Sequence, residues 1–110
     1  MIPSAAEKFP CNLFAMAFEI LTGSDPVIID VRLPSEFKEG HAKDAINIPL
    51  PKIPSRLTEL KLLEKPVVLC CDSRGRSFHA YTYLVRHGLT SVFHGGSWVV
   101  VDIIKNSSNK

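Results

Sequence analysis

The segment formed by residues 67–87 constrains the fold more than any other part of the chain. Residues 67–70 are a continuous apolar run of strand length, and residues 77–87 place apolar side chains at helical spacing until Gly88 ends the pattern. Only the short segment of residues 71–76 separates the two. A buried strand that leads through a tight loop into a helix is typical of α/β proteins with a parallel sheet.

The rest of the chain repeats this alternation of short apolar runs and helical periodicity. The patterns predict further strands at residues 27–29, 45–48 and 91–94, helices at 12–23 and 55–62, and a single helical turn at 35–37. Residues 98–104 suit a helix or a strand equally, because three consecutive valines lie within them. We therefore expect an α/β fold with three layers, in which helices cover both faces of a short, mainly parallel sheet.

Size and charge limit the classes of function that need to be considered. With 110 residues, 45% of them apolar, the chain suits one soluble domain over residues 1–110, and we expect about 11 residues at its start and about 5 at its end to be flexible. A net charge of only +2 gives no field that would attract nucleic acid. No apolar run approaches the roughly 20 residues that span a membrane, and no secretory signal is visible.

The cysteines and histidines favour neither a disulfide framework nor a metal site. The three cysteines are Cys11, Cys70 and Cys71. An odd number, two of them adjacent in sequence, disfavours a disulfide framework, so we expect a reducing, cytoplasmic location. The four histidines show no spacing that is typical of zinc ligands. We expect no metal and no cofactor.

Cys71 stands where a strand ends and a loop begins, which is a favourable place for a reactive thiolate. Successive N–H groups of such a loop can point at one anion, the following helix adds a partial positive charge, and Arg74 and Arg76 add full ones. The same loop could hold the anionic part of a substrate. The expected binding residues are Asp72, Ser73, Arg74, Gly75, Arg76 and Ser77. Ligands of parallel sheets bind beyond the carboxyl ends of the strands, where Arg32 and Gly95 are also expected.

Several short motifs, in order along the chain, together resemble the rhodanese-like family. They are Asp30-Val31-Arg32, Glu36-Phe37, Gly40-His41 with the following run to Pro49, Cys71 to Ser77, and Gly95-Gly96 with Trp98. The resemblance covers residues 27–98, which is most of the chain. It implies a rhodanese-like α/β fold and a sulfurtransferase whose nucleophile is Cys71. Three residues depart from the family pattern: Asp72 replaces a frequent basic residue, Arg74 a common glycine, and Asp44 another glycine.

The resemblance also implies a reaction and its partners. A small sulfur donor such as thiosulfate or a persulfide would pass its outer sulfur to Cys71, and cyanide or a thiol, including a protein thiol, would remove it from the resulting persulfide. Arg74 is the candidate for positioning the donor. Arg76 could contact the donor or could bond to backbone carbonyls beneath the loop. Asp30 and Arg32 are expected to support neighbouring loops as an ion pair.

Two other readings of the same residues stay open. The domain could be an interaction or regulatory module whose loop docks a thiol or an anionic tail of a partner with negligible turnover. Alternatively, Cys70 is followed by five residues before Arg76, a spacing that resembles cysteine-dependent phosphatases and arsenate reductases. In that reading Cys70 would be the nucleophile. Strand alternation argues against it, because if Cys70 points inward with Val68, then Cys71 is the residue at the mouth of the loop.

Overall fold

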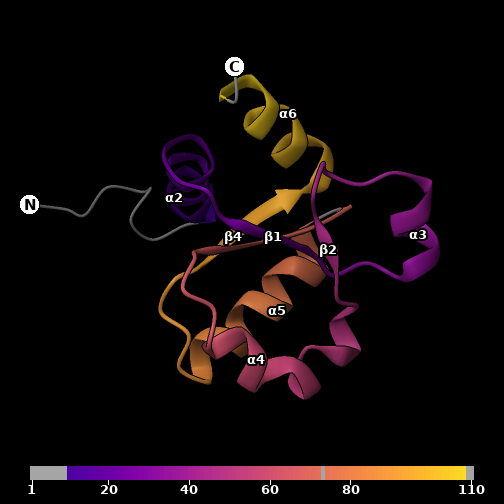
Figure 1. Ribbon diagram of the computed structural model, residues 1–110, viewed down its shortest axis with the longest axis vertical. Helices are drawn as coiled ribbons and strands as arrows, with labels where there is room; N and C mark the ends of the chain where they lie inside the picture. The colour runs from indigo at the N-terminus through magenta and orange to yellow at the C-terminus, as the bar shows by residue number, and fades with distance from the viewer. Residues whose placement is uncertain (1–9, 73, 109–110) are drawn as a thin grey trace, which may run out of the picture.

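Parallel strands form a single sheet at the centre of the computed structural model, which describes residues 10–72 and 74–108 (Figure 1). Within these residues the strands are β1 (Val27–Asp30), β2 (Ile46–Asn47), β3 (Val67–Cys71) and β4 (Val92–Ser97). Their order across the sheet is β2-β1-β3-β4, and every neighbouring pair is parallel. All five residues of β3 are buried, which explains why its sequence is a continuous apolar run rather than an alternating one.

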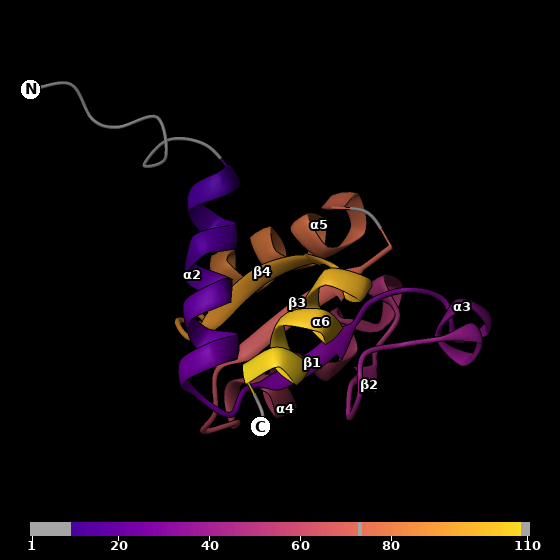
Figure 2. The ribbon, with the colours of Figure 1, turned by 90° about the horizontal axis from the view of Figure 1, so that it is seen from above.

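Helices cover both faces of this sheet. Helices α2 (Pro10–Gly23) and α6 (Trp98–Ser108) lie on one face, and α4 (Leu57–Lys61) and α5 (Arg74–Arg86) lie on the other (Figure 1). Seen from above, α2 and α6 lie over the strands (Figure 2). The short helix α3 (Pro34–Glu39) follows β1, and the 3-10 turns η1 (Leu50–Lys52) and η2 (Pro54–Arg56) precede α4. The predicted α/β class with three layers is confirmed.

Successive residues of β3 point to opposite faces of the sheet and so belong to different cores. Leu69 and Cys71 pack in the cluster beneath α5, whereas Val68 and Cys70 pack in the cluster beneath α2 and α6. Burying one such aliphatic side chain contributes about 1.5–3 kcal/mol to folding. The two adjacent cysteines are therefore separated by the sheet itself.

Gly95 and Gly96, which follow the strand predicted at residues 91–94, lie inside β4. The register between β3 and β4 shifts here, since Leu69 pairs with His94 while Cys70 pairs with Gly96. A Cβ atom on Gly95 would stand 2.7 Å from a Val68 methyl group and 2.9 Å from a Val101 methyl group. Gly95 therefore lets the strand bulge close against its neighbours, and the strand continues to Ser97 rather than ending at residue 94.

Helix α5 begins at Arg74, three residues earlier than the expected start at Ser77. The part of the loop predicted as irregular thus becomes the first helical turn, and only a short connection separates it from Cys71. This placement brings the amino end of a helix of 13 residues directly to the carboxyl end of β3.

The last apolar run is a helix, which resolves the ambiguity left by its valines. Val101 is buried and Trp98 and Ile104 are partly buried, while Val99, Val100 and Ile103 are exposed. Burial at intervals of three residues is a helical pattern that contiguous valines conceal in the sequence. The strand predicted at residues 45–48 is shorter than expected, with only Ile46 and Asn47 in the sheet.

Asp44, one of the departures from the family pattern, has a backbone conformation that favours glycine. Its φ angle is 66°, in the left-handed region. Aspartate tolerates this region better than most residues, because its short polar side chain can bond to the nearby backbone. The turn before β2 is therefore retained without the glycine.

Candidate active site

The sulfur of Cys71 lies under the first turn of α5. The Ser77 backbone N–H donates to Cys71 Sγ at 3.4 Å, and the Cys71 thiol donates to Ser77 Oγ at 3.2 Å. Cys71 is 0% exposed and packs in the core cluster that includes Ala80 and Leu84 of the same helix. The side chain therefore does not stand open at a mouth of the loop; the helix end covers it.

Ser77 also connects this sulfur to a histidine on the next strand. His94 lies on β4, is 3% exposed, and places its Nε2 atom 3.0 Å from Ser77 Oγ. Phe78 and Tyr81 of α5 pack around the imidazole, with ring centroids 5.5 Å and 6.3 Å away. No local sequence pattern predicts the bond between His94 and Ser77. His94 pairs with Leu69, whose side chain faces α5, so the register of β4 on β3 sets this orientation.

The guanidinium of Arg76 is held by two carboxylates. It donates to Glu36 Oε1 at 2.7 Å and Oε2 at 3.0 Å, and to Asp72 Oδ1 at 2.8 Å. The expectation that Arg76 might bond to backbone carbonyls beneath the loop is thus replaced by ion pairs with acidic side chains. The Arg76 bond, together with that from the Leu33 N–H, lowers the pKa of Glu36 to about 2, and the two carboxylates raise the pKa of Arg76. The Glu36 pair joins the start of α5 to α3, and the Asp72 pair joins it to the loop that follows β3.

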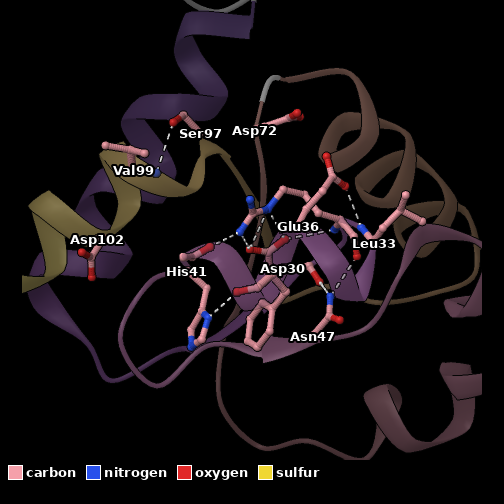
Figure 3. A network of polar contacts seen from close by, with 12 residues as sticks. Asp30, Leu33, Glu36, His41, Asn47, Asp72, Ser97, Val99 and Asp102 are labelled. Carbon is pink, nitrogen blue, oxygen red and sulfur yellow. Dashed lines mark hydrogen bonds and ion pairs between the residues drawn. The ribbon is translucent and has the colours of Figure 1, made fainter.

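Asp30 and Arg32 form a buried ion pair at the end of β1. Arg32 donates to both carboxylate oxygens of Asp30, at 2.8–3.1 Å, and its Nη2 also donates to the Gly40 carbonyl at 2.6 Å. Its guanidinium lies 5.0 Å from the centroid of the Trp98 ring. Asn47 completes the network by donating to the carbonyls of Asp30 and Arg32 (Figure 3). The pair holds the connections after β1 and β2.

The other predicted binding residues differ in their exposure and in their contacts. Asp72 is exposed and pairs with Arg76, whereas Gly75 is exposed in the first turn of α5. Ser73 and the side chains of Arg74 and Cys11 lie outside the described residues. Among the predicted set, the structure thus brings Ser77 into contact with the Cys71 sulfur and joins Arg76 to Asp72.

Cys70 lies on the opposite face of the sheet in an environment that favours the neutral thiol. Burial raises the pKa of Cys70 well above its ordinary value, and the nearby Asp30 and Cys71 raise it further. A thiol that resists ionisation is a poor nucleophile. This placement disfavours the reading in which Cys70 carries phosphatase or arsenate reductase chemistry.

Within residues 10–72 and 74–108, a cavity at the far end of the sheet and the possible metal ligands were the candidates for a second centre. A cavity of about 400 Å³ lies at the other end of the sheet, where Pro66, Gly88 and Ser91 line it near the starts of β3 and β4. Ligands of parallel sheets bind at the carboxyl ends instead. In the described parts of the chain, no group of three or more acidic, histidine or cysteine side chains could hold a metal ion. Within those same parts, no helix is both long and apolar enough to cross a bilayer.

Comparison with known proteins identifies the class to which this fold and site belong. A sequence model described as "Rhodanese-like domain" matches residues 17–99. The chain belongs to the rhodanese-like domain family, as its motifs indicated.

Individual relatives agree with this assignment. A protein named sulfurtransferase from Allochromatium vinosum is 34% identical over 70 residues, covering 64% of each chain. YqhL of Bacillus subtilis, an uncharacterized protein, is 40% identical over 67 residues, covering 61% of this chain and 52% of its own. The chain therefore spans about half to two thirds of the length of these curated relatives. A solved structure described as a rhodanese with anions from E. coli superposes with a TM-score of 0.63 at 28% identity, covering 69% of this chain and 91% of that one.

Proposed function

We propose that this domain is a sulfurtransferase that carries sulfur as a persulfide on Cys71. The observation that carries the proposal is the contact of the Ser77 N–H with Cys71 Sγ at the amino end of α5. An N–H donor and the positive end of a helix both favour negative charge on the sulfur. The same groups would stabilise the resting thiolate and the terminal sulfur of a persulfide anion.

The reaction proceeds in two displacements at sulfur. With thiosulfate, the Cys71 thiolate attacks the outer sulfur of the donor, a new S–S bond forms, and sulfite leaves with the electron pair of the bond that breaks. The acceptor, cyanide or a thiolate, then attacks the outer sulfur of the Cys71 persulfide. Cys71 leaves as a thiolate, which returns the protein to its starting state. A persulfide donor would react in the same way with a thiolate as leaving group.

Two features of the site define what donor binding must achieve. Because Cys71 has no exposed surface, the groups above its sulfur must shift for a donor to reach it. Because Arg76 already bonds to Glu36 and Asp72, we assign the role of positioning an anionic donor to Arg74. A donor bound at the start of α5 would lie close to the Cys71 sulfur and to Arg74.

The proposal is tested by the rate of thiocyanate formation from thiosulfate and cyanide. Cys71→Ser removes the nucleophile and should abolish turnover, whereas Cys70→Ser changes a thiol on the other face of the sheet and should retain most of it. A Cys71→Ser protein that keeps full activity would exclude Cys71 as the sulfur carrier.

The complete burial of Cys71 also favours a second candidate function. A domain whose sulfur stays covered could act as an interaction module that binds a thiol or anionic segment of a partner without turnover. The same assay separates the two, because the module predicts that wild type and Cys71→Ser are equally inactive with thiosulfate and with a persulfide donor.

A further inference from the structure

We propose that His94 is a positioning residue that takes up the proton of the Cys71 thiol through the Ser77 hydroxyl. The inference rests on the proposed function, since it assigns to Cys71 the role of nucleophile. It adds a proton acceptor to a site in which the helix dipole and the Ser77 amide favour the thiolate.

The three side chains form a continuous chain of hydrogen bonds. Cys71 Sγ lies 3.2 Å from Ser77 Oγ, and Ser77 Oγ lies 3.0 Å from His94 Nε2. They come from three different elements, β3, α5 and β4, which pack directly against one another. Cys71 and Ser77 are 0% exposed and His94 is 3% exposed, so water cannot readily replace any of these bonds.

The geometry serves both protonation states of the sulfur. In the neutral state the Cys71 thiol donates to Ser77 Oγ. We assign to His94 the tautomer protonated on Nδ1, so that its Nε2 accepts from the Ser77 hydroxyl across the 3.0 Å contact. When the thiol proton passes to Ser77 Oγ, the former hydroxyl proton passes to His94 Nε2. The thiolate then accepts from the Ser77 hydroxyl and from the Ser77 backbone N–H, while the imidazolium donates to Ser77 Oγ. The net charge of the trio is unchanged, and no other reactant is needed.

The surroundings of His94 favour a relay directed at Cys71. Against the imidazole, α5 places Phe78 and Tyr81 beside Ser77, and β3 contributes Leu69 as the register partner. The titratable groups that these described contacts bring to it are Cys71, reached through Ser77, and the Tyr81 phenol. Cys71 is the group that the chain of hydrogen bonds through Ser77 joins to His94, so it is the partner that exchanges a proton with the imidazole.

The experiment follows the pH dependence of Cys71 alkylation by iodoacetamide, with tandem mass spectrometry to distinguish Cys71 from Cys70. The variants are His94→Gln, which can bond to Ser77 but cannot hold an extra proton, and Ser77→Ala, which breaks the chain. His79→Gln, an exposed histidine of the same helix, is the matched control. We expect His94→Gln and Ser77→Ala to move the midpoint of the pH profile upward by about one pH unit, which makes alkylation below the midpoint roughly tenfold slower. The His79→Gln control should leave the midpoint unchanged. His94→Gln should approach the wild-type rate at high pH, which a loss of folding would not allow.

The outcomes separate this inference from the proposed function. If the His94→Gln profile coincides with that of wild type, the relay is wrong, although sulfur transfer through Cys71 would stand. If wild-type Cys71 reacts at no pH with iodoacetamide or with thiosulfate, the proposed function fails, and the relay fails with it.

Discussion

At the scale of single residues, the adjacent pair Cys70 and Cys71 shows how one step along a strand decides chemistry. Cys70 faces the core beneath α2 and α6, where burial raises its pKa. Cys71 faces α5, where it meets the Ser77 amide and hydroxyl. The alternation of side chains along a strand predicts that the two point to opposite faces. It does not predict that a helix end covers Cys71, because that depends on where α5 begins.

Gly95 is a position in the sheet where a larger residue should be poorly tolerated. A Cβ atom there would come within 3.0 Å of Val68, Val101 and the Leu69 carbonyl, so Gly95→Ala should destabilise the domain by about 1–3 kcal/mol through overpacking. Urea unfolding followed by circular dichroism measures this loss. Gly23→Ala is the control, since nothing lies within 4 Å of the added atom. Equal stability of the Gly95→Ala protein and wild type would contradict the close packing of β4 on β3.

At the scale of elements, the ion pair of Arg76 with Glu36 joins the start of α5 to α3. Glu36→Gln should therefore lower the melting temperature at neutral pH. The pKa of Glu36 falls from 4.5 to about 2 in the folded protein, so its contribution is complete above about pH 4.5 and disappears as the pH falls toward 2. The difference in melting temperature between wild type and Glu36→Gln should shrink across this range.

Thermal unfolding at a series of pH values checks this prediction. Glu39→Gln, on the exposed end of the same helix α3, serves as the control for loss of a negative charge. A difference that stays constant between pH 5 and about pH 2, or that matches the Glu39→Gln protein, would show that the Glu36 pair does not stabilise the fold.

Asp72 places a negative charge at the start of the same helix, next to the nucleophile in sequence. Asp72→Asn should raise kcat/KM for thiosulfate, because it removes repulsion of a dianion and releases part of Arg76. We expect an increase of about two- to tenfold at low ionic strength that shrinks as salt is added. Steady-state kinetics at two salt concentrations measures it, with Asp25→Asn, whose partner is Lys65, as the control. A lower or unchanged kcat/KM would mean that Asp72 supports the site through its bond to Arg76 instead.

At the scale of the whole molecule, the sequence predicted the layers and the end of the sheet where the site lies. Strand–helix alternation indicated the parallel sheet, and the motifs identified the rhodanese-like family. Other features depend on contacts between distant segments and could not be read from local patterns. The bulge at Gly95 depends on Val68 and Val101, the link from His94 to Ser77 depends on the register of β4, and the partners of Arg76 depend on the position of α3.

The most direct test of the account is the mass of the protein after brief treatment with thiosulfate and removal of the excess donor. Tandem mass spectrometry should locate one added sulfur atom on Cys71 and none on Cys70, and cyanide should then remove it. An added sulfur on Cys70, or a Cys71 that stays unmodified while the protein turns over thiosulfate, would contradict the central role of Cys71.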